Sequence, residues 1–155
     1  MNRIICIGSP FYAVDRAGHE VYCNLKDRAM PQHVELIDGG LDGLKLLCLV
    51  DGCEKVLFID NVSGFGAPNQ VMLFNDFEIS RLATEHFEHL SGLPYVLKMV
   101  PLVCERNLPT IRVLGIETPH QQSGVERAAR MALDLFNGEC EELWINAAGV
   151  KEGVS

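Results

Sequence analysis

The stretch from Lys55 to Gly66 reads Lys-Val-Leu-Phe-Ile-Asp-Asn-Val-Ser-Gly-Phe-Gly. Its apolar run, Val56 to Ile59, is unbroken and contains β-branched residues, which is typical of a strand covered on both faces. Asp60 follows the run directly, and a loop with two glycines comes after it. The pattern therefore predicts a buried strand with a carboxylate at its C-terminal end.

Two earlier runs have the same form. Ile4 to Ile7 leads into a turn at Gly8, with Asp15 shortly after. Val34 to Ile37 leads directly into Asp38-Gly39-Gly40. Helices between these strands require them to be parallel, so their carboxyl ends share one edge of the sheet, where open α/β sheets bind ligands. We therefore predict that this edge carries the function.

Length and composition indicate one globular domain. The chain has 155 residues, of which 48% are hydrophobic and 22% charged, and it contains no repeats. We expect a single domain over 1–155, with a core at about 3–137 and a C-terminal tail at 138–155. The net charge of −8, from 13 basic and 21 acidic residues, argues against nucleic acid and anionic membranes as partners, because both require a basic face.

We expect neither a targeting segment nor disulfide bonds. The first apolar run ends after Ile7, which is too short for a signal peptide, and no window reaches the roughly 20 apolar residues of a membrane span. We therefore expect a cytoplasmic protein. Six cysteines lie mostly in apolar runs without any Cys-x-x-Cys, so we expect buried free thiols. Gly8 opens no G-x-G-x-x-G, which argues against an ordinary dinucleotide site.

The remaining periodicity completes an α/β pattern. The segment Gln70–Phe74 follows the central strand too closely for a crossover helix, so it should pair antiparallel as an edge strand. We predict a last strand at Thr110–Ile116 and helices at about Val14–Leu25, Leu41–Val50 and Gly92–Val103, with a short helix at Glu139–Trp144. Another helix should run from a capping Ser123, paired with Glu126, to about Phe136. The inward residues should be Leu41, Leu44 and Leu47 in the second helix, Leu93, Val96, Leu97 and Val100 in the third, and Val125, Ala128, Ala132, Leu135 and Phe136 in the helix after Ser123. The result is a three-layer α/β fold with a mostly parallel five-stranded sheet, one antiparallel edge strand and helices on both faces.

Two of the candidate ligands have ordinary explanations. Asp15 lies in the first turn of a predicted helix, where an acid stabilises the helix dipole. His86 and His89 are three residues apart, so a helix would place them on one face, as in a metal-chelating pair. A solvated histidine pair has the same spacing, and the glycines after Ile37 are also common turn residues.

An ordered set of short motifs carries a resemblance to a known family. The motifs are Val34-Glu35-Leu36-Ile37-Asp38-Gly39-Gly40, then Leu44 and Leu47, then Val56-Leu57-Phe58-Ile59-Asp60, then His89-Leu90-Ser91-Gly92-Leu93 with Leu97, and finally Leu114-Gly115-Ile116. Together, and in register from about Ile4 to Phe136, they resemble the [NiFe]-hydrogenase maturation endopeptidases. Each motif is weak alone, and the ordered set is specific.

The resemblance implies a function and a site. It implies an aspartyl-type endopeptidase that removes the C-terminal extension of the hydrogenase large-subunit precursor after nickel insertion. The family's metal-contacting positions fall on Asp15, Asp60 and His89, and its Asp-Gly-Gly, implicated in activity or substrate recognition, falls on Asp38, Gly39 and Gly40. Nickel then arrives with the precursor, with no organic cofactor, and we expect a monomer that meets a larger partner.

The residues are compatible with this chemistry and leave its details open. Two carboxylates and an imidazole suit a borderline divalent ion such as nickel. They could read the precursor's metal, or position a water for hydrolysis with an acid as general base. No Ser-His-Asp set, nucleophile elbow or H-E-x-x-H supports another protease class.

The chain also departs from the family pattern at several positions. Arg16 beside Asp15 could pair with that carboxylate, Asn61 stands where the family has a small apolar residue, and Glu117 where it tends to have Gln. In the first loop the family usually has Gly-Asn and then paired acids followed by glycines, whereas this chain has Gly8-Ser9 and Val14-Asp15-Arg16-Ala17-Gly18. This altered loop favours, as an alternative, a non-catalytic relative that binds the precursor as a chaperone. A small-ligand-binding α/β module is a third hypothesis, which the missing phosphate loop disfavours.

Overall fold

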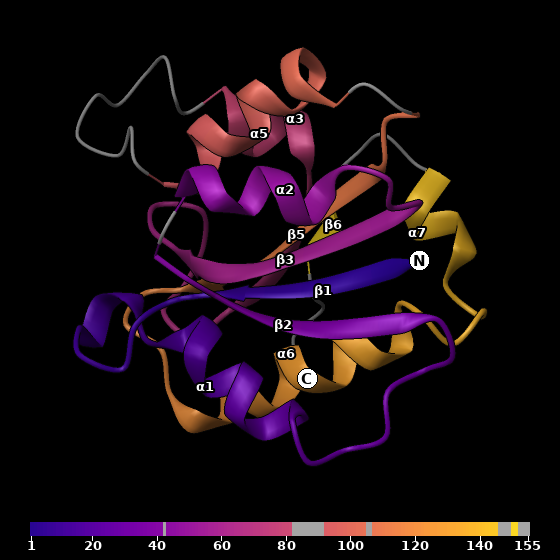
Figure 1. The fold of residues 1–155 in the computed structure, drawn as a ribbon. Helices are drawn as coiled ribbons and strands as arrows, with labels where there is room; N and C mark the ends of the chain where they lie inside the picture. Colours follow the sequence, from indigo (N-terminus) through magenta and orange to yellow (C-terminus); the bar gives the residue numbers. More distant parts are fainter. Residues whose placement is uncertain (42, 82–91, 105–106, 146–149, 152–155) are drawn as a thin grey trace.

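The central sheet forms around the apolar run at residues 56–59. The computed structural model describes residues 1–41, 43–81, 92–104, 107–145 and 150–151. Its strands follow the apolar runs of the sequence, and they are β1 (Asn2–Ile7), β2 (Val34–Gly40), β3 (Lys55–Val62), β4 (Val71–Asn75), β5 (Thr110–Glu117) and β6 (Val150–Lys151). They form one mixed sheet in the order β2-β1-β3-β5-β4-β6 (Figure 1).

The pairing of the strands confirms the predicted sheet. β1 pairs parallel with β2 and β3, and β3 pairs parallel with β5. β4 pairs antiparallel with β5, as the short connection from β3 predicted. The two-residue β6 was not predicted, and it pairs antiparallel with the outer side of β4.

Helices cover both faces of the sheet and separate two apolar cores. The helical segments are η1 (Ala13–Asp15), α1 (Ala17–Leu25), η2 (Gly43–Lys45), α2 (Leu46–Val50), α3 (Asp76–Ser80), α5 (Leu93–Val103), α6 (Gln122–Asp134) and α7 (Glu141–Ile145). α1 and α6 lie on one face, and α2, α3 and α5 on the other (Figure 1). Because side chains alternate along β3, Leu57 and Ile59 enter the first core while Val56 and Phe58 enter the second.

Two helices match their predicted core faces. The residues predicted to face inward on α5 are all buried, and they are Leu93, Val96, Leu97 and Val100. On α6, Val125, Ala128 and Ala132 are buried as predicted. Hydrophobic spacing at a period of 3.6 therefore identifies the buried face of a helix that is long enough to show it.

The predicted core face of the helix at 41–50 was wrong. Leu41 is 49% exposed and Leu44 is 61% exposed, whereas Leu46 and Val50 are buried. Of the predicted residues, only Leu47 packs against the core, partly buried. The chain first makes the 3₁₀ turn η2, which has three residues per turn, and this turn shifts the phase of the short α2 helix that follows.

Two predicted helix starts were also wrong. α1 begins at Ala17 and not near Val14, because Ala13–Asp15 form the separate 3₁₀ turn η1. Ser123 does not cap α6, whose N-cap residue is Gln121. Asn69 from the β3–β4 loop binds the N-terminal end of α6 instead. Its Oδ1 accepts the Gln121 N–H at 2.7 Å, and its Nδ2 donates to Ser123 Oγ at 2.9 Å.

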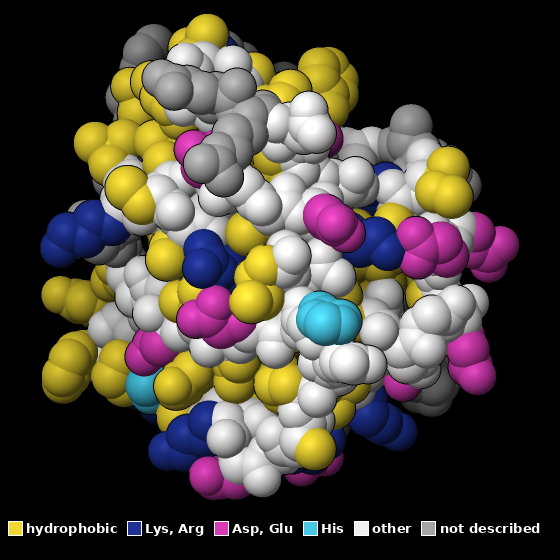
Figure 2. Space-filling model, turned by 45° about the vertical axis from the view of Figure 1, so that its right-hand side comes forward, with side chains coloured by type: hydrophobic (Ala, Val, Ile, Leu, Met, Phe, Trp, Pro, Cys, Tyr) yellow, Lys and Arg dark blue, Asp and Glu magenta, His cyan; other side chains and the backbone are white. Residues whose placement is uncertain are grey.

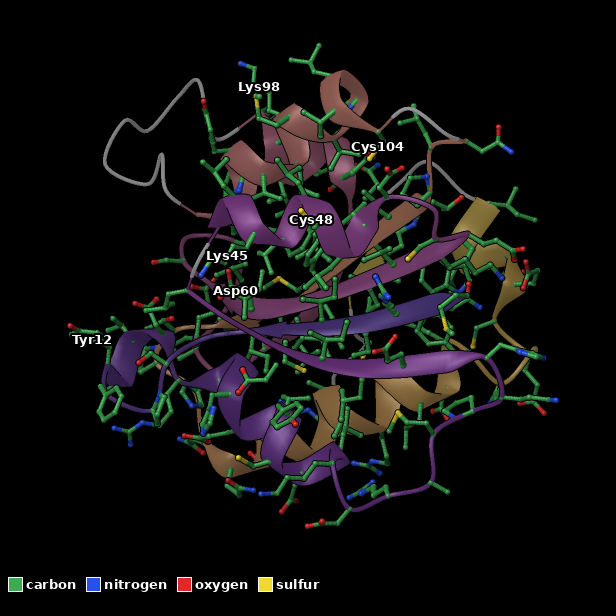
Figure 3. The ribbon with its side chains drawn as sticks, in the orientation of Figure 1. Tyr12, Lys45, Cys48, Asp60, Lys98 and Cys104 are labelled. Carbon is green, nitrogen blue, oxygen red and sulfur yellow. The ribbon has the colours of Figure 1, made fainter. Side chains whose placement is uncertain are left out.

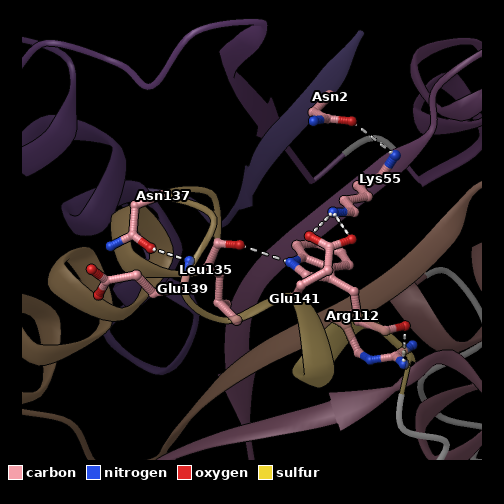
Figure 4. A network of polar contacts seen from close by, with 8 residues as sticks. Asn2, Lys55, Arg112, Leu135, Asn137, Glu139 and Glu141 are labelled. Atoms are coloured by element: carbon pink, nitrogen blue, oxygen red, sulfur yellow. Dashed lines mark hydrogen bonds and ion pairs between the residues drawn. The ribbon is translucent and has the colours of Figure 1, made fainter.

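A polar network holds α7 against the sheet (Figure 4). The buried Arg112 guanidinium of β5 donates to the carbonyls of Leu143 at 2.9 Å and Trp144 at 2.7 Å. The Trp144 indole donates to the Leu135 carbonyl at 2.8 Å, and Lys55 Nζ lies 2.7 Å from the Glu141 carboxylate. The short helix predicted near 139–144 therefore docks at the amino ends of the strands.

The surface around the amino ends of the strands carries mixed charge. Figure 2 shows acidic and basic side chains next to each other on this side of the molecule, without a broad basic area among the described residues drawn there. Arg3 and Glu35, 3.2 Å apart, form one such pair. All six cysteines are free thiols, as predicted, but the expectation that they are buried holds only for Cys6 and Cys53, since Cys23 and Cys48 are exposed. Among the described residues, no helix has both the length and the apolar character that a bilayer crossing requires.

Candidate active site

Three acidic residues lie at the carboxyl edge of the parallel strands. Asp15 ends η1, which follows β1. Asp38 lies near the end of β2, and Asp60 lies near the end of β3. Because β1, β2 and β3 are parallel neighbours, the segments that follow them leave the sheet at one edge. This edge is the usual ligand site of an open α/β sheet.

Asp60 is the most perturbed of these acids. It is partly buried near the carboxyl end of β3, where Figure 3 labels it. Its pKa is raised to about 8, mainly by burial; the backbone N–H of Asn61 opposes the shift, and the negative charge of Asp15 adds to it. An acid with a pKa near neutrality can hold or release a proton under physiological conditions.

Close packing of α1 brings Asp15 toward Asp60. A Cβ atom at Gly18 would lie 1.8 Å from the Ile7 carbonyl oxygen and 2.8 Å from that of Ile59, so only glycine lets α1 rest on the ends of β1 and β3. The turn before α1 is closed by the Ser9 N–H, which donates to the Asp15 carbonyl at 2.8 Å. The fold thus holds the two acids at neighbouring strand ends.

Asn61 connects the three segments around this acid pair. Its Oδ1 accepts the Ala17 N–H at 2.9 Å, at the start of α1. Its Nδ2 donates to the Ile116 carbonyl at 3.2 Å and to Thr118 Oγ1 at 3.3 Å, and lies 3.4 Å from Nδ1 of His120. Asn61 therefore links β3, α1 and the β5–α6 loop next to Asp60, a role that the sequence did not reveal.

Asp38, Gly39 and Gly40 continue β2, so the prediction of a loop directly after Ile37 was wrong. Gly40 has φ +59°, a left-handed conformation that favours glycine, and its carbonyl accepts the Gly8 N–H at 3.1 Å. Its own N–H donates to Asp38 Oδ1 at 3.3 Å. Asp38 is exposed, and its charge adds to burial in raising the pKa of the Cys6 thiol in the paired strand. The Asp38 carboxylate therefore remains accessible at the same edge.

The loop after β3 is shaped by Glu117 of β5. This carboxylate is 3% exposed and accepts three backbone N–H groups, from Gly64 at 3.0 Å, Phe65 at 2.7 Å and Gly66 at 2.8 Å. Three such bonds satisfy a buried carboxylate. Glu117 stood out in the sequence only as a departure from the family pattern, and the structure shows it fixing the loop that borders Asp60.

Arg16 turns toward Glu20 on α1. Its Nε lies 4.0 Å from Glu20 Oε1. The sequence suggested a pairing of Arg16 with Asp15, whereas the ion pair in the structure joins Arg16 to Glu20.

The third predicted ligand, His89, lies outside the described residues, as does His86. Among the residues that the structure describes, no group of three or more His, Cys, Asp or Glu side chains is placed to hold a metal ion. Asp15 and Asp60 of the predicted trio lie in segments at the same edge of the sheet, near enough for the charge of Asp15 to act on Asp60, and their role as ligands stays a prediction, as does the position of the imidazole.

The sequence also matches a family model described as hydrogenase maturation protease, over residues 20–139. The chain belongs to the hydrogenase maturation protease family. This protease is therefore a peptidase by family. The matched span contains Asp38, Gly39, Gly40 and Asp60, whereas Asp15 precedes it.

Solved structures of similar proteins share the fold of this protease. A hydrogenase maturating endopeptidase, HybD from E. coli, has 20% identity and a TM-score of 0.74, with 97% of each chain covered. A hydrogenase 2 maturation peptidase from Thaumarchaeota archaeon SCGC_AB-539-E09 has 24% identity and a TM-score of 0.56, covering 86% of this chain and 93% of that one. The [NiFe] hydrogenase maturation protease HybD from Thermococcus kodakarensis has 19% identity and a TM-score of 0.60, covering 88% of this chain and 99% of that one. No curated protein matched the sequence.

Proposed function

We propose that this maturation protease removes the C-terminal extension of the nickel-loaded [NiFe]-hydrogenase large-subunit precursor, and that Asp15, Asp60 and His89 read the precursor's nickel. The observation that carries the proposal is the pair of acids at the carboxyl edge of the sheet, where burial raises the pKa of Asp60 to about 8. The similar solved structures, a hydrogenase maturating endopeptidase and a [NiFe] hydrogenase maturation protease among them, support the same substrate class.

The donor set fits a nickel ion that the substrate presents. Carboxylate oxygens and an imidazole nitrogen are suitable ligands for a borderline divalent ion. An ion held partly by the precursor needs only a few further ligands from the protease. Loss of the Asp60 proton when the nickel approaches would couple recognition of the metal to a change of charge at the cleavage site.

Asp38, Gly39 and Gly40 are proposed to contact the precursor beside this site. Gly39 has no room for a side chain, since a Cβ would lie 2.9 Å from the Ile5 side chain and 3.1 Å from the Cys6 carbonyl oxygen. The exposed Asp38 carboxylate at the end of this tight strand can accept hydrogen bonds from a peptide backbone.

Cleavage of a nickel-loaded precursor tests the proposal. The purified protein is mixed with loaded and with nickel-free precursor, and the products are weighed by mass spectrometry. We expect mass loss only from the loaded precursor, and a rate at least ~100-fold lower for Asp60→Asn. Asp27→Asn, the same change at an exposed position after α1, is the control and should cut normally.

The same variants separate the two roles of Asp60. If its carboxylate reads nickel, Asp60→Asn should bind loaded and nickel-free precursor equally, whereas a carboxylate that serves only as a general base leaves the preference for loaded precursor intact. Absence of any mass loss with the wild type would remove the endopeptidase proposal and leave a precursor-binding chaperone.

A further inference from the structure

A pocket of about 330 Å³ opens beside the acid pair, on the face of the sheet that α1 and α6 cover. This volume is at the lower end of the range for ligand sites and accommodates one or two residues of a peptide. The charged and polar side chains that line it are Arg16, Glu20, Thr118, His120, Gln121 and Gln122.

The pocket is joined to the candidate active site through two neighbours of the acids. Arg16 directly follows Asp15, and its side chain forms part of the wall. His120 also lines the pocket and lies 3.4 Å from the amide of Asn61, which directly follows Asp60. Since side chains alternate along β3, Asn61 points toward α1 while Asp60 points to the other face. A peptide crossing the end of β3 would therefore meet the acids and the pocket in succession.

The hydrogen-bonding groups of the pocket are unbalanced. Asn61 Nδ2 is a donor, so the facing Nδ1 of His120 accepts and the ring proton lies on Nε2, which is 3.4 Å from Glu20 Oε2. The Arg16 guanidinium carries five N–H donors. Its Nε is buried and, within the described part of the chain, has no hydrogen-bond partner. Glu20 is the acid of this pocket, and its carboxylate lies 3.4 Å from His120 Nε2 and 4.0 Å from Arg16 Nε. The contact with Arg16 is an ion pair that is too long for a hydrogen bond, so the guanidinium donors stay open to a further acceptor.

We propose that this pocket binds a carboxylate side chain of the precursor, next to the bond that is cleaved, and that Arg16 determines this specificity. The inference rests on the proposed function for the identity of the substrate. A carboxylate supplies the acceptors that the buried Nε lacks, and guanidinium groups bind carboxylates through paired N–H donors.

Kinetics with paired variants test the proposal. Each acidic residue near the cleaved bond of the nickel-loaded precursor is changed singly to its amide, and each precursor is cut by the wild type and by Arg16→Gln. We expect Arg16→Gln to raise KM roughly tenfold to a hundredfold while kcat changes less than about threefold. One amide substitution in the precursor should raise KM by a similar factor and cause no further loss with Arg16→Gln.

A charge exchange sharpens this test. Arg16→Glu should cut a precursor with lysine at that same position at least ~10-fold faster than the native precursor. Arg28→Gln, the same change at an exposed residue after α1, is the control and should keep the wild-type KM. Additive losses at every acidic position of the precursor, or an unchanged KM for Arg16→Gln, would overturn the proposal.

A binding measurement distinguishes failure of this inference from failure of the proposed function. Asp60→Asn should hold the intact precursor, and calorimetry gives its Kd with and without Arg16→Gln. If the wild type does not cut at all, the endopeptidase proposal falls, while a roughly tenfold weaker Kd with Arg16→Gln still supports the pocket. An equal Kd in both backgrounds counts against the pocket whatever the cleavage result.

Discussion

The surroundings of Asp60 in the folded protein disfavour the charged form of its carboxyl group. Its pKa is raised from 3.8 to about 8 by burial, with a further contribution from the charge of Asp15. Between these two pH values the folded protein binds the proton more tightly than the unfolded chain does. The stability associated with Asp60 is therefore complete below about pH 4 and is lost as the pH rises through about 8. A residue that reduces stability at neutral pH is typical of a functional site.

Replacing Asp60 by asparagine should remove this loss. Each unit of pKa shift corresponds to about 1.4 kcal/mol, and because Asp60 keeps some contact with solvent we expect a partial effect of about 2 kcal/mol. Asp60→Asn should thus be more stable than the wild type by that amount at pH 9 and equal to it near pH 4, as measured by urea unfolding. The Asp27→Asn control should show no such pH dependence. A variant that is equally or less stable at pH 9 would contradict the assigned shift.

At the residue scale, the sequence predicted the positions of the acids better than the residues whose hydrogen bonds hold the segments around them. Asp15, Asp38 and Asp60 could be identified because each follows an apolar strand, which fixes its place at the sheet edge. Asn61 and Glu117 could not, because their roles depend on groups that are distant in the chain. Glu117 binds backbone N–H groups 51 to 53 residues away, and no local pattern reports such contacts.

At the element scale, the segment from Gly64 to Gly66 depends on one carboxylate for its shape. If Glu117 is truncated to alanine, three backbone N–H groups lose a charged acceptor, so we expect Glu117→Ala to lose about 2–3 kcal/mol of unfolding free energy. Glu117→Gln keeps an acceptor of similar shape and should lose about 1 kcal/mol. Urea unfolding measures both losses, and limited proteolysis should cut the alanine variant within residues 63–68.

The matched control for this loop is Glu126→Ala, at an exposed position of α6. It should unfold within about 0.5 kcal/mol of the wild type, as ordinary surface substitutions do. Equal stability of Glu117→Ala and Glu126→Ala would show that the loop does not need the buried carboxylate.

The helices show how far periodicity carries a prediction. α5 has 11 residues, enough for its apolar spacing to repeat, and its buried face was predicted correctly. α2 has only five residues and follows a 3₁₀ turn, so a pattern counted from Leu41 ran out of phase. The prediction of the α6 cap was wrong for a different reason: the N-terminal end of α6 is bound by Asn69, which comes from another loop.

At the scale of the whole molecule, the parallel strands place their following loops at one edge and α7 at the other. The sequence predicted this polarity from three strands that each end in an acid-containing segment. It could not predict the order of the strands, because pairing between distant strands leaves no periodic signal. Two exposed apolar residues lie at opposite ends of the strands. Phe11 is in the segment between β1 and α1, at the carboxyl edge, and Ile145 is in α7, at the amino edge.

This distinction gives a prediction about how the protease binds its substrate. Phe11 is 85% exposed, and Leu44, after β2, is 61% exposed at the same edge, so burying them against the precursor would offset their exposure to water. We expect Phe11→Ser to leave the unfolding free energy within about 0.5 kcal/mol of the wild type while lowering kcat/KM for the precursor roughly tenfold. Ile145→Ser removes a comparable apolar surface, 78% exposed, at the opposite end of the strands and should leave kcat/KM unchanged. Equal losses in the two variants would mean that the precursor does not dock specifically at the carboxyl edge of the sheet.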